Sequence, residues 1–252
     1  MAIALSVNLN KIALLRNSRE GNFPDLIEHA ETCIAAGVQG ITVHPRPDQR
    51  HIRPDDCRHL TQLITPLSDI EFNIEGNPFE GAQGSYPGFM ELVLASMPDQ
   101  ATLVPDGQSQ LTSDHGFDLK TSGKRLAPII AQLKNEGIRV SLFMDPDLEQ
   151  IALAKQIGAD RIELYTGPFA KAYAEGQPLP IFNQHVAAAQ YATGLGLEVN
   201  AGHDLNLANM TLYRHLPGLA EVSIGHALTV DSIAMGMTTA IGCYLSLCAV
   251  GE

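Results

Sequence analysis

The sequence has few cysteines and no Cys-x-x-Cys pair. Its four cysteines are Cys33, Cys57, Cys243 and Cys248. Their spacing forms no even framework, so they are predicted to be reduced thiols in a cytoplasmic protein rather than disulfide partners.

Basic residues are also scarce. The chain has 16 Lys and Arg residues against 28 Asp and Glu residues, which gives a formal net charge of −12. Nucleic-acid binding requires clustered cations, so this balance argues against a nucleic-acid partner. No basic segment precedes the first apolar stretch, and we therefore expect no signal peptide.

One long stretch without charge, residues 232–250, raises the question of a membrane span. Gly236, Gly242 and several hydroxyl-bearing side chains interrupt it, which weakens that interpretation. We expect it to form the last helix of a barrel, covered on one side by the barrel and on the other by a partner subunit. No membrane partner is predicted.

What the sequence does contain is a repeated pattern of short runs rich in Val, Ile and Leu. The runs cover residues 3–8, 41–44, 70–75, 101–105, 139–144, 161–166, 198–203 and 221–226. Their mean spacing of about 31 residues matches one strand–helix–strand unit, and the length of 252 residues is typical of one eight-stranded barrel. The predicted fold is α/β: a single (β/α)8 TIM barrel over residues 1–252, with extra short helices.

The segments between the runs are predicted to be helices and functional loops. Helices are expected over residues 24–36 and 182–193, and up to residue 157 from an N-cap at Asp145 with Pro146 in the first helical position. Long connections follow the first run, at residues 16–23, and the fourth, at residues 106–120. The second contains Gln108, Ser109 and Thr112, and we expect a mobile lid loop there.

Polar side chains stand where the runs end. These residues are Asn8, His44, Glu75, His203 and His226, with Glu163 inside the sixth run. Because the carboxyl ends of parallel barrel strands meet at one mouth, these side chains are expected to surround a single pocket.

The residue types indicate acid–base chemistry. His44 is suited to be a general base near neutral pH. Glu75 ends an apolar strand, where a carboxylate is costly unless it is paired or used in proton transfer. Glu163 alternates with Ile162 and Leu164 and should point into the barrel. The alternative for both carboxylates is a structural ion pair.

Other residues are suited to bind anions. Asn10, Lys11, Arg16 and Arg19 form the densest basic cluster of the sequence, which predicts an anion site; the alternative is a solvated basic loop. Arg46 and His51 follow His44 and suit phosphate capture. Gly202 and Gly225 would allow phosphate to approach the backbone after the last two strands.

Two further points concern the histidines. His29, His59, His185 and His215 fall in predicted helices and are expected at the surface. A zinc or iron site made of His44, His51, Glu75 and His203 is the alternative to acid–base chemistry. Chemistry without a cofactor on a phosphorylated carbonyl compound also explains the Arg, Lys and Gly-His features, which a metal site does not.

The segments that carry these residues resemble one family over essentially the whole chain. VNLNKIALLRNSR, GITVHPRPDQRHI, FNIEG, LVPDGQSQLTSDHG, SLFMDPD, IELYTGP, VNAGHDLN and VSIGHAL look like the pyridoxine 5′-phosphate synthase family of vitamin B6 biosynthesis. The resemblance implies a (β/α)8 barrel that assembles as a homo-octamer without metal or organic cofactor. It also implies a transferase-type synthase that condenses 3-amino-2-oxopropyl phosphate with 1-deoxy-D-xylulose 5-phosphate. The implied products are pyridoxine 5′-phosphate, inorganic phosphate and water.

The resemblance also implies residue roles. His44 and Glu75 would be proton acceptors, His203 a proton donor, and Glu163 would stabilise the transition state. The aminoketone phosphate would be held by Asn8, Arg19, Gly225 and His226, with Asp204 assisting. The pentulose phosphate would be held by Asn10, Lys11, Arg46, His51 and Thr112.

This chain departs from the family pattern in two places. Asn10-Lys11 stands where many members have Asp-His, and Asp204 stands where they have Gly. Two other functions stay open on the sequence alone: a metal-dependent sugar-phosphate isomerase or aldolase on the same fold, and a non-catalytic barrel that binds phosphorylated metabolites.

Overall fold

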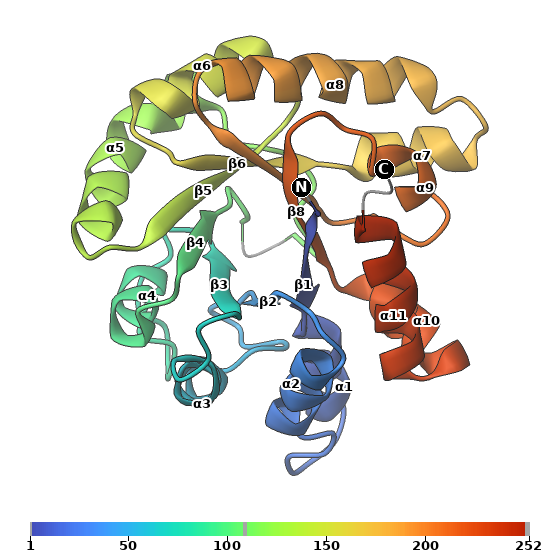
Figure 1. Cartoon of the computed structure of the whole chain (residues 1–252). Helices are drawn as coiled ribbons and strands as arrows, with labels where there is room; N and C mark the ends of the chain where they lie inside the picture. Colours follow the sequence, from blue (N-terminus) through green and yellow to red (C-terminus); the bar gives the residue numbers. More distant parts are fainter. Residues whose placement is uncertain (1, 108–109, 250–252) are drawn as a thin grey trace.

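The protein is described by a computed structural model that covers residues 2–107 and 110–249. Eight parallel strands form a closed barrel in sequence order, with β1 pairing β8 to complete the ring (Figure 1). The strands are β1 (Ala4–Asn8), β2 (Gly40–Val43), β3 (Glu71–Gly76), β4 (Gln100–Leu103), β5 (Arg139–Met144), β6 (Arg161–Tyr165), β7 (Glu198–Gly202) and β8 (Leu219–Ile224). The predicted (β/α)8 barrel is confirmed, and each strand lies at a predicted apolar run.

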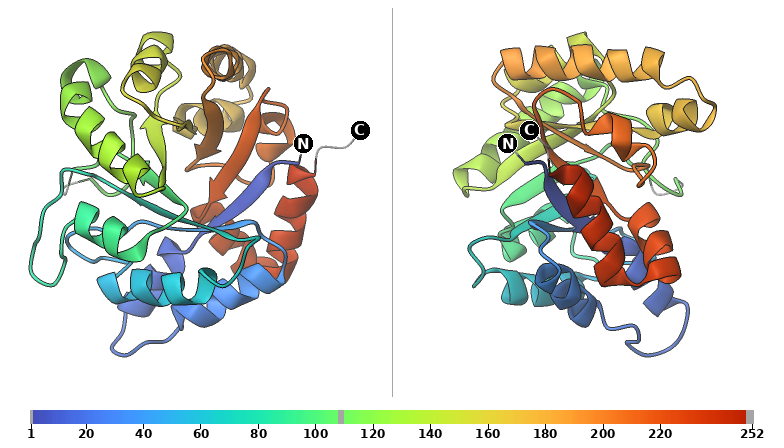
Figure 2. Two further views of the ribbon diagram at one scale, coloured as in Figure 1. Left: turned by 60° about the vertical axis from the view of Figure 1, so that its left-hand side comes forward. Right: turned by 45° about the vertical axis from the view of Figure 1, so that its right-hand side comes forward.

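The helices within the described residues surround this barrel. They are α1 (Asn10–Asn17), α2 (Leu26–Ala35), α3 (Pro54–Ile64), α4 (Phe89–Ser96), α5 (Leu119–Asn135), α6 (Leu148–Gln156), α7 (Gly167–Ala174), α8 (Leu179–Gly194), α9 (Met210–Tyr213), α10 (His226–Met235) and α11 (Met237–Cys248). Two helices instead of one follow β1, β6 and β8, so the prediction of extra short helices is confirmed. Figure 2 shows α10 and α11, in red, beside the blue α1 and α2, where they close the ring of helices.

Three local predictions are wrong. The helix after β5 begins at Leu148, and its N-cap is Asp147, whose side chain accepts hydrogen bonds from the Glu149 and Gln150 amides at 2.8 and 3.1 Å. Asp145 instead accepts a bond from the Gly116 amide at 3.1 Å, so its carboxylate is used by the loop before α5 and does not cap α6.

The second correction concerns residues 232–250, which do not form one helix. Gly236 has φ 84°, a left-handed conformation, and separates α10 from α11. Glycine adopts it without the steric cost that a Cβ would impose. None of the helices in the described part of the chain combines the length and apolar character needed to cross a membrane.

The third correction concerns His185, which is not at the surface. It is fully buried, and its Nδ1 lies 2.8 Å from the hydroxyl oxygen of Tyr213. Among the other three histidines of this set, His59 and His215 are exposed and His29 is half-buried.

Alternation along the strands separates an apolar layer from a polar barrel interior. Leu5 and Val7 of β1 are buried in the hydrophobic core, whereas the intervening Ser6 is hydrogen-bonded to Thr42 of β2 at 2.7 Å. Asn73 continues this chain by donating to Thr42 at 3.3 Å and accepting from Thr102 at 3.1 Å. A hydrogen-bonded interior fixes the inward-pointing side chains, which include the acidic residues nearer the mouth.

The opposite end of the barrel is closed by ion pairs. Arg161 donates to Glu221 at 3.1 Å and also pairs with Glu198, while Arg139 pairs with Glu71. These charged residues therefore pair with one another at the amino ends of the strands. The polar residues at the carboxyl ends lie at the other mouth, where barrel enzymes carry their functional sites.

Candidate active site

Three strands bring Asn8, His44 and Glu75 together at the carboxyl end of the barrel. Nδ1 of His44 lies 3.8 Å from Oε2 of Glu75, and the same oxygen accepts a hydrogen bond from Nδ2 of Asn8 at 3.3 Å. His44 and Glu75 are both less than one-tenth exposed. The predicted convergence of an imidazole and a carboxylate from different strands is therefore present.

Asn10 holds the backbone beneath this group rather than standing free in the pocket. Its side-chain oxygen accepts a hydrogen bond from the His44 amide at 2.9 Å, and its own amide donates to Oδ1 of Asn8 at 3.0 Å. The side-chain oxygen of Asn10 thus ties the segment after β1 to the end of β2, while its backbone N–H is satisfied by Asn8.

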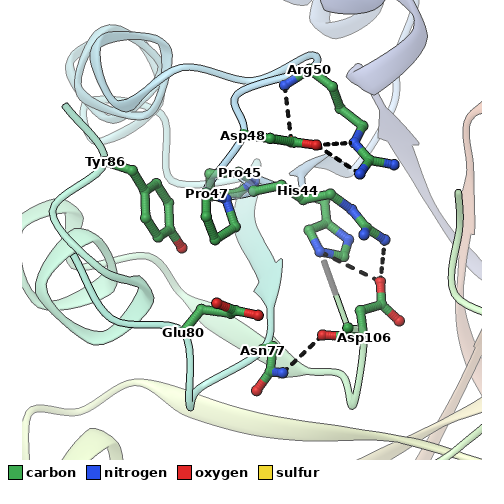
Figure 3. A pocket seen from close by; sticks show the side chains of 11 residues that line it. His44, Pro45, Pro47, Asp48, Arg50, Asn77, Glu80, Tyr86 and Asp106 are labelled. Atoms are coloured by element: carbon green, nitrogen blue, oxygen red, sulfur yellow. Dashed lines mark hydrogen bonds and ion pairs between the residues drawn. The ribbon is translucent and has the colours of Figure 1, made fainter. Parts of the chain in front are cut away.

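Arg46 is buried and ion-paired with Asp106, the residue that follows β4 by three positions. The same Asp106 oxygen, Oδ2, accepts a bond from Ser113 at 2.8 Å and lies 3.8 Å from Nε2 of His44. Figure 3 shows His44 and Asp106 facing one another in a pocket at the carboxyl end of the barrel. Its lining comes from the loops after β2, β3 and β4.

The loop after β4 reaches across the mouth. Arg46 and Arg50 both donate to the Gln110 carbonyl, at 3.3 and 2.9 Å. Farther along, Oγ1 of Thr112 lies 2.5 Å from Nε2 of His203. The loop therefore connects the β2 side of the pocket with the β7 side, a position suited to a lid. Gln108 and Ser109 of the predicted lid lie outside the described residues.

The side chain of Glu163 is buried inside the barrel, beside Gly202 of β7. It has 3 % exposure, and Gly202 lies in contact with it, because a Cβ at that position would overlap Oε1 of Glu163. Among the described residues, Glu163 has no ion-pair partner, so the structural ion pair considered for it is absent. Its inward orientation agrees with the predicted strand alternation.

His203 is held in an unusual backbone conformation, with φ 98°. For a residue with a Cβ this conformation is strained, and such strain is concentrated at functional sites. Nδ1 of His203 lies 3.0 Å from Oδ2 of Asp204, and its ring meets Tyr165 edge-on with 5.5 Å between ring centres. Asp204 thus stands beside the imidazole, with its side chain 45 % exposed.

Gly225 and His226 lie at the first turn of α10. Gly225 is the N-cap residue, and a Cβ there would stand 2.9 Å from Cβ of Asn8. The close approach of β8 to β1 therefore requires glycine. His226 is exposed at the helix N-terminus, where free backbone N–H groups favour an anion.

In the basic cluster around α1, Arg16 is buried in an ion pair, whereas Lys11 and Arg19 have solvent-accessible side chains. Arg16 is 1 % exposed, and its guanidinium donates to Asp56 at 2.6 and 2.8 Å and to the His51 carbonyl at 3.0 Å. The prediction that Arg16 contributes to an anion site is wrong because Asp56 neutralises it in the interior. The predicted long connection after the first run begins after Asn17 instead of at residue 16, because α1 extends to Asn17. Lys11 is half-buried on α1, and Arg19 is exposed beyond its end.

His51 lies at the back of the pocket. It is 9 % exposed, its ring centre is 6.2 Å from that of His44, and its Nδ1 has no hydrogen-bond partner in the described part of the chain. Burial lowers the pKa of His51 to about 3, and Arg46 and Arg50 act in the same direction. His51 is therefore neutral at physiological pH.

Burial and neighbouring charges shift the pKa of His44 and the pKa values of Glu75 and Glu163 in opposite directions. Burial lowers the pKa of His44 well below its ordinary value, with Arg46 and His51 adding to the effect. Burial raises the pKa of Glu75 to about 8, with Asp106 and Glu221 adding to it. For Glu163, burial again raises the pKa, followed by the charges of Glu75 and Glu221. A neutral imidazole beside proton-holding carboxyl groups is an arrangement for proton transfer.

Sequence reasoning did not single out two residues of this site, Asp106 and Tyr165. Asp106 follows an apolar run within three residues, as His44 and His203 do, and this signal was available in the segment LVPDG. Tyr165 ends β6, but an aromatic residue in an apolar strand carries no functional signal by itself.

A closed (β/α)8 barrel whose buried imidazoles and carboxyl groups meet at the carboxyl ends of its strands has the architecture of a barrel enzyme. The particular family follows from comparison of the sequence. The chain belongs to the family described as pyridoxal phosphate biosynthesis protein PdxJ, whose model matches residues 5–250.

Curated relatives cover the whole chain. A protein of Xanthomonas campestris pv. campestris (strain B100), named pyridoxine 5′-phosphate synthase, is 53% identical over 252 residues, covering 100% of this chain and 98% of that protein. A protein of Albidiferax ferrireducens with the same name is 48% identical over 253 residues, covering 100% of both chains. The chain is thus an enzyme of a family whose curated relatives carry this synthase name.

Solved structures that are similar at low sequence identity show the fold alone. One is a 3-hexulose-6-phosphate synthase from Salmonella typhimurium, with a TM-score of 0.65, 15% identity and 98% coverage of both chains. Another is a 3-keto-L-gulonate-6-phosphate decarboxylase from Vibrio cholerae, with a TM-score of 0.65, 10% identity and 100% coverage of both chains. Both agree with the barrel architecture.

Proposed function

We propose that this enzyme condenses 3-amino-2-oxopropyl phosphate with 1-deoxy-D-xylulose 5-phosphate to pyridoxine 5′-phosphate, inorganic phosphate and water, without metal or organic cofactor. The observation that carries the proposal is the position of His44 against Glu75, with Glu163 and His203 at the same mouth. Imine formation, phosphate loss and dehydration each move a proton at a different atom. Such a sequence requires several acids and bases around one cavity.

His44 and Glu75 are proposed as the proton acceptors. His44 is neutral because burial lowers its pKa, so it has a nitrogen lone pair available near neutral pH. Glu75 holds a proton in the unliganded site because burial raises its pKa. The ammonium group of an aminoketone beside Glu75 would favour the ionised carboxylate, so arrival of this substrate would turn Glu75 into a base.

Glu163 and His203 are proposed to act on the intermediates. Burial raises the pKa of Glu163, so this carboxyl group holds a proton in the unliganded site. An iminium that develops beside it would favour the ionised carboxylate, which would then stabilise the positive charge. His203 can donate a proton because its ring is solvent-accessible at one edge and Asp204 lies beside Nδ1. Thr112, in contact with Nε2 of His203, would bring the loop after β4 into the reaction.

The two phosphate groups are proposed to bind on opposite sides of the mouth. Gly225 and His226 at the start of α10, with Asn8 and Arg19, would hold the aminoketone phosphate. Asp204 would assist through its backbone N–H, because its carboxylate would repel the phosphate. Helix N-termini bind phosphate through free N–H groups, and α10 is ten residues long. The pentulose phosphate would be held by Asn10, Lys11, Arg46, His51 and Thr112.

Self-association is part of the proposal. Exposed apolar side chains gather on α1, α10 and the turn between α1 and α2, including Phe23 at 84 % and Ile233 at 81 % exposure. Helices α1 and α10 are in contact, so these side chains belong to one face. Apolar patches of this kind mark protein interfaces, and we propose a homo-octamer. Light scattering of Ile233→Glu against the natural chain tests whether this face is used.

The alternative is a metal-dependent isomerase or aldolase. In the part of the chain that the structure describes, no group of three or more His, Cys, Asp or Glu side chains is arranged as a metal site. The family match favours the synthase. Loss of turnover with a chelator, together with stoichiometric metal in the purified protein, would favour the alternative.

The direct experiment is incubation with both phosphorylated ketones, with the pyridine ring detected by absorbance and phosphate release measured in parallel. The proposal expects both products from the natural chain, and neither from His44→Ala or Glu75→Gln, provided that circular dichroism shows both variants folded. Retained turnover in both variants would remove the catalytic assignment. Tight binding of both ketones without a product would instead indicate a non-catalytic binding barrel.

A further inference from the structure

Asp106 occupies the centre of the β2–β4 side of the pocket, and none of the roles proposed above uses it. It is 4 % exposed and stands three residues after β4. Its neighbours come from three segments: Arg46 and His44 at the end of β2, and Ser113 on the loop that crosses the mouth. A buried carboxylate shared by these groups is placed to influence all three.

The hydrogen bonding of Asp106 differs from that of a structural ion pair in the same protein. In the Arg16–Asp56 pair both carboxylate oxygens accept from the guanidinium, and Oδ2 of Asp56 also accepts from the Arg53 amide at 2.7 Å. In Asp106 all contacts fall on Oδ2, whereas Oδ1 is buried and has no partner among the described residues. An arrangement built only for stability would satisfy both oxygens.

His44 has a carboxyl group at each ring nitrogen. Nδ1 faces Glu75 and Nε2 faces Asp106, each at 3.8 Å (Figure 3). The charged or titratable groups that surround the ring from the other elements are Arg46, Arg50, His51 and His203. Burial lowers the pKa of His44, and the charges of Arg46 and Arg50 act in the same direction, so the imidazole is neutral and carries one proton. The two carboxyl groups determine which ring nitrogen holds that proton.

The two carboxyl groups are not equivalent. Burial raises the pKa of Asp106, whereas the Arg46 guanidinium and the Ser113 hydroxyl oppose this shift and favour the ionised form. Within residues 2–107 and 110–249, Glu75 has no Lys or Arg at hydrogen-bond distance, and its contacts are with Asn8 and His44. An ionised carboxylate attracts an N–H donor, whereas a protonated carboxyl group can itself donate to a nitrogen lone pair.

We propose that Asp106 is a positioning residue that holds His44 as its Nε2–H tautomer, so that the Nδ1 lone pair faces Glu75 and the reacting atoms. The inference rests on the proposed function for its catalytic meaning. The 3.8 Å separation is longer than a hydrogen bond, and catalytic contacts of this kind tighten when substrate binds. Ser113 links the same carboxylate to the loop, so closure of the loop and orientation of His44 are coupled.

Magnetic resonance of the full chain labelled with 15N-histidine tests this orientation without substrate. His44 is assigned by comparison with His44→Gln, and the tautomer is identified by which ring nitrogen carries the proton. We expect Nε2–H in the natural chain and a rise of the Nδ1–H form in Asp106→Ala, which has no acceptor. A natural chain with Nδ1–H, or an unchanged tautomer in Asp106→Ala, would overturn the proposal.

A matched variant separates local contact from general charge. Asp48→Asn removes another negative charge from the same pocket, but Asp48 pairs with Arg50 and makes no contact with His44. We expect the His44 resonances of Asp48→Asn to keep the Nε2–H pattern. An equal change in Asp48→Asn and Asp106→Ala would show a field effect instead of positioning.

Kinetics of Asp106→Asn, which keeps the side-chain shape, provide the second readout. We expect kcat to fall at least about 10-fold because His44 loses its orienting charge, with KM for the pentulose phosphate unchanged or lower because Arg46 is released. Loss of a negative charge next to Glu75 should also move the acid limb of kcat/KM to lower pH. A fall in kcat with an unmoved limb would indicate a merely structural role.

The two proposals fail separately. If the natural chain makes no pyridine product but the Asp106 variants change the His44 tautomer as expected, the reaction is wrong and the positioning stands. If the product forms and the tautomer does not respond, Asp106 is not the residue that positions His44.

Discussion

The carboxyl group of Glu163 lies directly against the Cα atom of Gly202 on the neighbouring strand. The two strands pair in register here, with Glu163 opposite Asn200 and Tyr165 opposite Gly202. A Cβ atom at Gly202 would overlap Oε1 of Glu163. The position of this buried acid therefore depends on the absence of a side chain on β7.

Gly202→Ala is expected to displace Glu163. Overpacking at a buried position costs about 1–3 kcal/mol, and we expect kcat to fall more than KM rises because the acid moves relative to the reacting atoms. The control is Gly242→Ala on α11, where a Cβ meets nothing within 4 Å; helix propensity predicts a stabilisation of up to about 1 kcal/mol there. Thermal melting and steady-state kinetics of both variants measure this, and equal kinetics in the two would contradict the role of Gly202.

Glu75→Gln should change how stability depends on pH. The pKa of Glu75 is raised to about 8 from an ordinary value of 4.5, so between these values the folded state binds more protons than the unfolded state. The free energy of unfolding therefore falls as pH rises through this range, and the loss is complete above the folded pKa. Gln is neutral throughout and lacks this loss.

The measurement is the Tm of Glu75→Gln and the natural chain at several pH values. We expect similar Tm values near about pH 5 and a higher Tm for the variant near about pH 9, by at least about 1 kcal/mol or roughly 2–4 °C. Activity should fall about 10²- to 10⁴-fold. Because histidine titrations affect both proteins equally, a Tm difference that does not vary with pH would contradict the raised pKa.

Arg16 and Arg19 are three residues apart, but replacing each with alanine should change stability and substrate binding differently. Arg16→Ala leaves Asp56 buried without its cation, which costs about 3–5 kcal/mol. Arg19 is exposed, and Arg19→Ala should leave Tm within about 0.5 kcal/mol of the natural value while raising KM for the aminoketone phosphate. Chemical denaturation and kinetics of the two variants check this; an Arg16→Ala protein of natural stability would show that the buried pair contributes little.

Thr112→Val should weaken the connection between the loop after β4 and His203. The side chain keeps its shape but loses the hydroxyl that contacts Nε2 of His203 at 2.5 Å. We expect kcat/KM to fall by about 2- to 13-fold, because a hydrogen bond of this kind contributes about 0.5–1.5 kcal/mol. Tm should not change because Thr112 is exposed. The control is Thr121→Val on α5, because the Thr121 hydroxyl donates to the Asp118 carbonyl at 3.0 Å at the start of that helix. Equal kinetic losses in both variants would contradict a specific contact.

Much of the site was predictable because strand periodicity fixes direction. The alternation of Glu163 with Ile162 and Leu164 predicts an inward carboxyl group, and the structure has one. His44 and Glu75, from runs about 30 residues apart, meet at one mouth because parallel strands in a closed barrel end at the same edge.

Other assignments failed because composition does not reveal partners. Arg16 looked like part of a basic anion site, but Asp56, forty positions along the chain, neutralises it in the interior. His185 looked like a surface residue of a helix, but that helix turns it toward Tyr213. Asp106 was overlooked although its neighbours Arg46 and Ser113 make it central to the pocket.

The sequence by itself determined the barrel and the set of residues that face its mouth, because both follow from the spacing and the alternation of residues along single strands. Only the tertiary structure decided which charges neutralise one another and which are left for chemistry. Ion pairing and burial depend on side chains from different strands, and their distances are fixed when the barrel closes.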